Sequence, residues 1–187
     1  MNFSQVPTTP KDLTLYNSVR QSMSTGDMLG WKSYSLIGKA IRLRTIPEDV
    51  PEDSPLQINH ISGIIRLREY EGLDRRVFIT EALEHGAVLN LLSRRLESFD
   101  GAVWWYPLQE TWNPNRCSVG EQALSFIGVP YDYQAIVAQL FGSVSVDVKS
   151  LFCSEYYYRS LGFIEGDAPN PYEMATKEYF GTPVRIL

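Results

Sequence analysis

The spacing of apolar residues changes twice along the chain, from helical to strand-like and back to helical. Leu13, Tyr16 and Val19 recur on one helix face, whereas the block from 60 to 108 contains short apolar runs separated by turn residues. The predicted helices are 9–24, 36–43, 93–99, 118–127, 133–141 and one that opens at Phe152. The predicted strands are 28–34, 60–67, 76–83, 87–91, 102–108 and 184–187.

Consecutive strands with short turns favour an antiparallel sheet, because tight hairpins can join such strands. The 187 residues are enough for one domain with a buried core. We therefore expect a single α+β domain over 1–187, with a barrel-like antiparallel sheet packed against helices. Residues 1–8 are expected to be a flexible N-terminus, and residues 164–173 a loop.

The segment 45–57 is interpreted as an exposed loop. Its sequence, TIPEDVPEDSPLQ, holds three prolines and four acidic residues and few residues that could build a core. The segment is long enough to be a flap over an active site, and a plain solvated linker is an equally good interpretation.

The formal net charge of −5 argues against the basic surface that nucleic-acid binding requires. No apolar run approaches the roughly 20 residues that span a bilayer, and the N-terminus lacks the basic and apolar regions of a signal peptide. Two distant cysteines do not make a disulfide framework. We therefore expect a cytoplasmic protein without a nucleic-acid partner or a transmembrane segment, although a protein released by lysis would have the same composition.

Cys153 has the position of a nucleophilic thiol if the last long helix opens at Phe152. The positive end of the helix dipole would then favour the ionised sulfur, and the backbone N–H of Cys153 would be free to stabilise an oxyanion. Ser154 and Glu155 suit a first helical turn. The alternative is that Cys153 is a small buried side chain without a chemical role, as free cysteines often are.

His60 and Glu81 are the candidates for the base and for the group that orients it. His60 stands at the start of a strand beside a loop, where a base is both rigid and accessible. Glu81 interrupts an otherwise apolar strand, so it is either exposed or buried against a partner. If strands 60–67 and 76–83 form a hairpin, the two residues lie near the same end of the sheet.

The other histidine and the other cysteine are interpreted as residues without a catalytic role. His85 lies in a turn, which favours a solvated surface side chain. Cys117 also precedes a helix, but no further motif surrounds it. A zinc site built from these two residues with Cys153 and His60 is formally possible, yet no pair has the close spacing typical of zinc ligands. We expect no metal and no other cofactor.

Six short segments follow one another in an order that is typical of a known family. They are Gly26-Asp27, Leu36-Ile37-Gly38, Asn59-His60-Ile61-Ser62-Gly63-Ile64, Glu81-Ala82, Gly128-Val129-Pro130-Tyr131-Asp132-Tyr133 and Phe152-Cys153-Ser154-Glu155. This arrangement resembles the circularly permuted NlpC-type papain-like enzymes, the YiiX-like group, over about residues 20 to 180. In ordinary papain-like enzymes the cysteine precedes the histidine, whereas in the permuted group the histidine strand comes first, as it does here.

The resemblance implies a papain-like fold with Cys153 as nucleophile, His60 as general base and Glu81 as the orienting residue, which is the most variable position in the family. It also implies that Gly26 and Asp27 are architectural. Relatives include amidases, peptidases, lipid-directed hydrolases and acyltransferases. The expected activity is therefore hydrolysis of an amide or ester bond through an acyl-enzyme, with a peptide, amide or acyl-ester substrate.

Two alternatives to this activity stay open. One is a catalytically silent binding or structural module on the same fold. The other is a lipid-directed hydrolase or acyltransferase, which would need an exposed apolar or amphipathic element near the site, and the acidic segment 45–57 is not such an element.

Overall fold

The computed structural model describes residues 11–83, 86–128, 146–163 and 165–187, except for the side chains of Ile37 and of 146–152. Its strands are β1 (Met28–Ser33), β2 (His60–Ile65), β3 (Phe78–Leu83), β4 (Gly86–Leu91), β5 (Gly101–Tyr106) and β6 (Val184–Arg185). Its helices are α1 (Thr14–Val19), α2 (Leu36–Thr45), α3 (Leu92–Ser98), the 3-10 helix η1 (Glu110–Asn115), α4 (Arg116–Ser125), α6 (Val146–Ser160) and α7 (Pro171–Ala175). The predicted helix 133–141 and the predicted helix start at Thr9-Pro10 lie outside the described residues.

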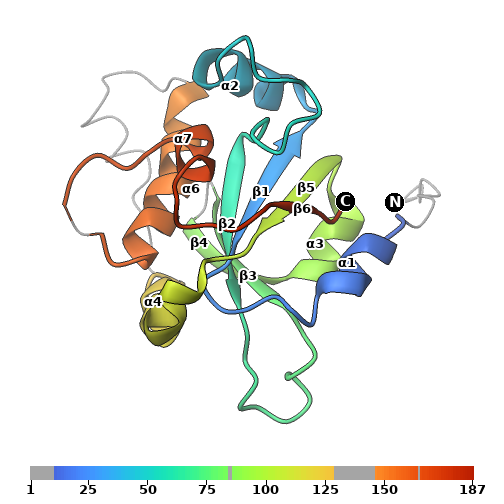
Figure 1. The fold of residues 1–187 in the computed structure, drawn as a ribbon, viewed down its shortest axis with the longest axis vertical. Coiled ribbons are helices and arrows are strands. Elements are labelled where there is room, and N and C mark those ends of the chain that lie inside the picture. The colour runs from blue at the N-terminus through green and yellow to red at the C-terminus, as the bar shows by residue number, and fades with distance from the viewer. Residues whose placement is uncertain (1–10, 84–85, 129–145, 164) are drawn as a thin grey trace, which may run out of the picture.

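The strands form one antiparallel sheet in the order β4-β3-β2-β1-β5-β6. The antiparallel α+β architecture predicted from the strand pattern is therefore confirmed. The sheet is open, with β4 and β6 at its edges, so the described strands do not close into the expected barrel. Strands β1 and β2 occupy the middle of the sheet, and this places the start of β2 inside the molecule (Figure 1).

Helices cover both faces of the sheet, and each face has its own apolar core. On one face, Tyr16 of α1 and Leu92 and Leu96 of α3 pack against side chains of β1, β2, β3 and β5. On the other face, α4, α6 and α7 contribute Val119, Tyr157 and a set of neighbours to a second core. Figure 1 shows the sheet between the α1–α3 pair and the group formed by α4, α6 and α7.

Asp27 joins the second core to the start of β1. Its buried carboxylate accepts hydrogen bonds from the backbone N–H of Leu108 at 3.1 Å and from Trp105 Nε1 at 2.9 Å, and it pairs with Arg116 at 2.7 Å. Gly26 has a φ of 90°, a conformation that favours glycine. Both residues hold the chain between α1 and β1 in place, which is an architectural role.

Two predicted boundaries in the last third of the chain are wrong. Helix α7 begins inside the segment predicted as a loop, 164–173, and it starts with a capping box in which Asn170 and Glu173 cap each other's backbone N–H. Helix α6 begins at Val146 and not at Phe152, so Cys153 is the eighth residue of this helix. The β-branched valines at 146 and 148 have low helix propensity, and tertiary packing overrides such a preference.

Candidate active site

Three different elements bring the predicted site residues together. His60 is the first residue of β2, Glu81 lies on β3 and Cys153 lies on α6. The β2–β3 pairing runs from Ile65 to Gly63, and His60 and Glu81 both lie beyond that last pair. The hairpin therefore forms as predicted, and its open end places the imidazole, the carboxylate and the thiol next to one another.

The side chain of His60 connects the other two groups. Its Nε2 lies 3.3 Å from Glu81 Oε2, and its ring also makes a hydrogen bond with the side chain of Cys153. Since Glu81 occupies Nε2, Nδ1 is the ring nitrogen left for the thiol. The carboxylate is fully buried, whereas the His60 side chain is 19% exposed. The result is a continuous carboxylate–imidazole–thiol chain.

Neighbouring charges favour the protonated form of this imidazole. Burial alone would lower the pKa of His60, but the negative charge of Cys153, its hydrogen bond, and the contact with Glu81 together raise the pKa to about 10. A histidine in this state is an imidazolium beside the Cys153 sulfur. An adjacent imidazolium is the group that favours the thiolate form of a cysteine nucleophile.

Glu81 is held by two partners in addition to His60. Asn90 Nδ2 donates to Glu81 Oε1 at 3.0 Å, and Arg95 Nε lies 3.1 Å and 3.4 Å from the two carboxylate oxygens. Burial would raise the pKa of Glu81, but the hydrogen bond and charge of His60, followed by Arg95 and Asn90, lower it to about 2. The carboxylate therefore stays ionised inside the protein.

Arg95 is itself fixed by two aromatic rings. Its guanidinium lies 5.3 Å from the ring centroid of Trp31 and 5.5 Å from that of Phe99, within the range of cation–π attraction. Neither Arg95 nor Asn90 is among the residues predicted from the sequence. Asn90 had the same signal that singled out Glu81, a polar residue inside an apolar strand, whereas no pattern distinguishes Arg95 from the neighbouring Arg94.

The position of Cys153 within α6 corrects one part of the predicted mechanism. Only the first four N–H groups of a helix lack partners within the helix, and Cys153 is the eighth residue. The expected contribution of the helix N-terminus and of the Cys153 N–H as an oxyanion donor is therefore wrong. The thiol is also 1% exposed, so a substrate can reach the sulfur only if neighbouring groups move.

Cys117 has the opposite environment. It is exposed in the first turn of α4, and its sulfur lies 3.7 Å from Glu121 Oε1. The negative charge of Glu121, together with this hydrogen bond, raises the pKa of Cys117. A raised pKa disfavours the thiolate, so Cys117 lacks the electrostatic support that His60 gives to Cys153. The other histidine, His85, lies outside the described residues.

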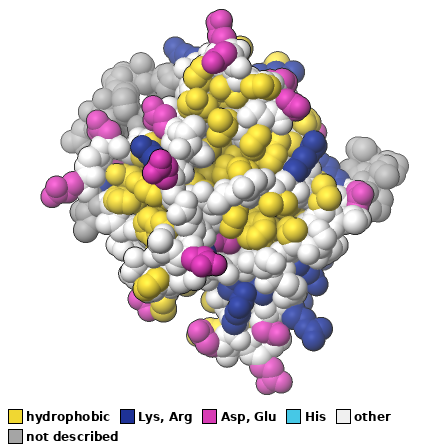
Figure 2. All heavy atoms as spheres, in the orientation of Figure 1, with side chains coloured by type: hydrophobic (Ala, Val, Ile, Leu, Met, Phe, Trp, Pro, Cys, Tyr) yellow, Lys and Arg dark blue, Asp and Glu magenta, His cyan; other side chains and the backbone are white. Residues whose placement is uncertain are grey.

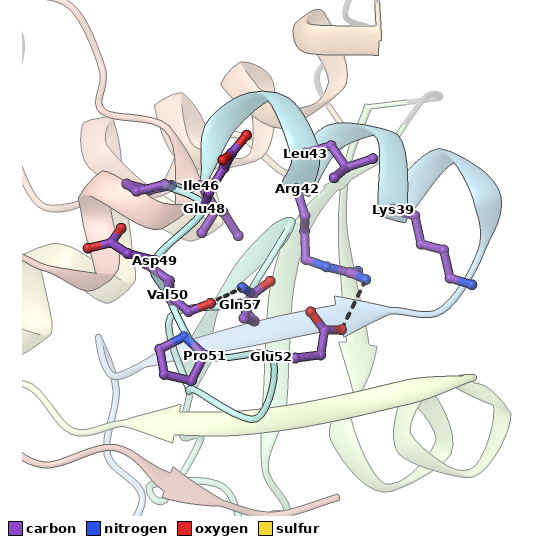
Figure 3. Close-up of a pocket in the computed structure, with 11 residues that line it drawn as sticks. Lys39, Arg42, Leu43, Ile46, Glu48, Asp49, Val50, Pro51, Glu52 and Gln57 are labelled. Atoms are coloured by element: carbon purple, nitrogen blue, oxygen red, sulfur yellow. Dashed lines mark hydrogen bonds and ion pairs between the residues drawn. The ribbon is translucent and has the colours of Figure 1, made fainter.

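The loop between α2 and β2 is exposed over residues 47–49 and 51–53, and it is anchored at several points. Glu52 pairs with Lys32 at 2.7 Å and with Arg42 at 3.8 Å, and Gln57 Nε2 donates to the carbonyl of Val50 at 2.9 Å. Figure 3 shows Arg42 and Glu52 directed toward each other across a cavity of about 680 Å³ between the loop and α2. None of the three candidate residues lines this cavity.

Helix α2 exposes apolar side chains on the outside of the molecule. Leu36 is 85% exposed and Leu43 is 84% exposed, and a spacing of seven residues places them on one helix face. Apolar side chains gather in the upper part of the face drawn in Figure 2, where Figure 1 places α2. Among the described helices none is long and apolar enough to cross a membrane.

Comparison with known proteins gives a likeness in fold. No protein-family model matches the chain, and no curated protein matches its sequence. The chain is similar to the crystal structure of the metalloprotein YiiX (DUF1105) from Escherichia coli O157:H7, with a TM-score of 0.51 and 15% sequence identity. The match covers 86% of this chain and 96% of that chain, so the similarity extends over most of the fold and concerns the arrangement of the backbone.

Proposed function

We propose that this protein is a cysteine-dependent hydrolase that cleaves an amide or ester bond through an acyl-enzyme on Cys153. The observation that carries the proposal is the continuous contact from Glu81 through His60 to Cys153. A buried carboxylate that orients an imidazole, which in turn contacts a thiol, is the arrangement that nucleophilic catalysis requires.

The proposed reaction has two steps. In the first, the Cys153 sulfur attacks the carbonyl carbon, and the His60 imidazolium gives its proton to the amine or alcohol that leaves. In the second, neutral His60 removes a proton from water, the resulting hydroxide attacks the thioester, and the carboxylic acid departs as the thiolate–imidazolium pair is restored. Glu81 keeps the imidazole in position through both steps and remains ionised.

The permuted papain-like fold is the architecture that we infer for this chemistry. The order of His60, Glu81 and Cys153 in the chain and the likeness to YiiX in fold support this inference. YiiX itself is described as a metalloprotein. Among the side chains described for the present chain, no three His, Cys, Asp or Glu residues are arranged to hold a metal ion. The described side chains therefore do not fit a metal site, and no step of the proposed reaction passes through a metal ion.

Trapping the acyl-enzyme tests the proposal. After a short incubation with p-nitrophenyl acetate, intact-protein mass spectrometry should show one added acetyl group, and peptide mapping should place it on Cys153. The adduct should be absent in Cys153→Ala and present in Cys117→Ala, which is the matched control. A panel of activated amides and esters extends the test to longer acyl groups. Absence of any acyl adduct on Cys153 across the panel would favour the silent binding module.

The second candidate function is hydrolysis at a lipid surface, and the exposed leucines of α2 favour it. An interfacial hydrolase needs an apolar element at its surface, and Leu36 and Leu43 flank Lys39 on such a helix face. Replacing both leucines with serine should lower binding to anionic vesicles at least about tenfold, because each buried leucine contributes roughly 1.5–3 kcal/mol. Co-sedimentation measures this, with Leu15→Ser on α1 (53% exposed) as control. Equal sedimentation of all variants would exclude α2 as a membrane-binding element.

A further inference from the structure

Arg66 is a buried arginine whose charge has no acidic partner. It follows β2 directly and is 9% exposed. Its two terminal nitrogens donate to backbone carbonyls, those of Arg20 at 2.9 Å and Asp74 at 2.7 Å. Its Nε is buried and has no hydrogen-bond partner within the described part of the chain. Buried polar groups of this kind usually have a partner, so an orphaned donor suggests a missing ligand.

Other arginines increase the positive charge around Arg66. Burial lowers the pKa of Arg66, and repulsion from Arg68 and Arg20 lowers it further, while Tyr16 and Asp74 oppose this effect. Over the described residues, no carboxylate forms an ion pair with Arg66, Arg68 or Arg20. A charge that is buried without a counter-ion is unfavourable.

Arg116 is an arginine whose positive charge is paired with a carboxylate. Its guanidinium lies 2.7 Å from the buried carboxylate of Asp27. Arg116 and Arg66 line the same cavity, so one of its cations is neutralised and another is not.

A cavity of about 420 Å³ gives a ligand access to this charge. Arg66 and Arg68 lie along it with the hydroxyl-bearing residues Ser24 and Thr25. Glu69 and Glu121 also line it, and both act on Cys117, whose pKa their negative charges raise. Cationic and anionic side chains therefore line the same cavity.

We propose that Arg66 and Arg68 bind a phosphate group in this cavity, either as the free ion or as a small phosphate monoester. Two guanidinium groups without acidic partners match the charge of a phosphate, which is about −1.5 to −2 near neutral pH. Guanidinium donors also suit the geometry of phosphate oxygens. The site is separate from Cys153 and His60, so it does not depend on the proposed hydrolase activity.

Titration with inorganic phosphate tests the site. The melting temperature of the full-length protein is followed while sodium phosphate replaces sodium chloride at constant ionic strength and pH. Binding to the folded state raises the melting temperature with the logarithm of the phosphate concentration once this exceeds the dissociation constant. A general ionic effect on a chain with a net charge of −5 would instead be reproduced by sodium chloride of equal ionic strength.

Two variants locate the binding. Arg68→Gln replaces an exposed side chain and should weaken phosphate binding about tenfold or more, because hydrogen bonds to charged groups contribute that much. Arg66→Gln should abolish binding if the variant folds. Arg94→Gln, which changes an exposed arginine on α3, should bind as the wild type does. If the melting temperature of the wild type does not rise when phosphate replaces chloride, or if the affinity of Arg68→Gln is unchanged, the proposal is overturned and Arg66 only holds backbone carbonyls.

Discussion

Replacing His60 with alanine is expected to slow alkylation of Cys153 by iodoacetamide about a hundredfold at pH 6. An ordinary thiol ionises near pH 8.5, so only about one sulfur in 300 is a thiolate at pH 6. An adjacent imidazolium keeps the sulfur ionised at lower pH, and the pKa of His60, raised to about 10, keeps this imidazolium charged. The wild-type rate should be nearly constant from pH 6 to pH 9, whereas the variant should gain about tenfold per pH unit.

Peptide mass spectrometry measures the alkylation of the two cysteines separately, so Cys117 serves as the internal control. Cys117 is exposed and remote from His60, so its rate should be the same in both proteins. Because Cys153 is buried, the alkylation rate of each cysteine in the folded protein is divided by the rate of the same cysteine in the protein unfolded by urea. A His60→Gln variant, which keeps most of the side-chain volume without the charge, should behave like the alanine variant. If the Cys153 rate rose with pH in the wild type as steeply as in both variants, the ion pair would not exist.

Replacing Glu81 with alanine is expected to lower the free energy of unfolding by about 3 kcal/mol at pH 7. The fully buried carboxylate has its pKa lowered from 4.5 to about 2, and a shift of this size corresponds to about 3 kcal/mol at 1.36 kcal/mol for each pKa unit. Removing it also leaves Arg95 and Asn90 without their acceptor. Urea denaturation measures the loss, and Glu97→Ala, which breaks a surface pair with Arg94, should change stability by less than about 1 kcal/mol.

The pH dependence of this loss has a defined sign. The folded-state pKa of Glu81 is below its unfolded value, so the stabilisation is fully present above pH 4.5 and disappears as the pH falls toward 2. The difference between wild type and Glu81→Ala should therefore shrink in acid. Glu81→Gln keeps two hydrogen-bonding atoms but no charge, and its stability should lie between the two. A difference between wild type and Glu81→Ala that is equal at pH 7 and pH 3 would show that packing, and not charge, makes Glu81 important.

The pattern of apolar residues is sufficient to predict the antiparallel sheet and the proximity of His60 to Glu81. Successive strands without an intervening helix favour antiparallel neighbours, and the pairing of β2 with β3 brings the start of β2 near the end of β3, so the proximity of His60 and Glu81 follows from this pairing. The start of α6 could not be predicted from the sequence pattern, because the first turns of this helix contain valines whose intrinsic preference is for strands. The capping box of α7 was visible in the sequence as Asn170 and Glu173 and was overlooked.

The partners of Glu81 could not be predicted for a different reason. Arg94 and Arg95 are adjacent in the sequence, yet only Arg95 points toward Glu81, while Arg94 pairs with Glu97 at the surface. Which of the two faces inward depends on the rotation of α3 against the sheet, and that rotation is set by Leu92 and Leu96 in the core. Such a choice depends on tertiary packing and has no signature in composition or spacing.

The sheet order has a consequence for how the protein matures during synthesis. β1 to β4 are neighbours in sequence order, so they can pair while the ribosome is still making the rest of the chain, and His60 can meet Glu81 at that stage. α6, which carries Cys153, is made much later and packs onto β2 and β3. The nascent chain can therefore bring His60 and Glu81 together before Cys153 is made, and the thiol of Cys153 first appears when the sheet that shields it is already available.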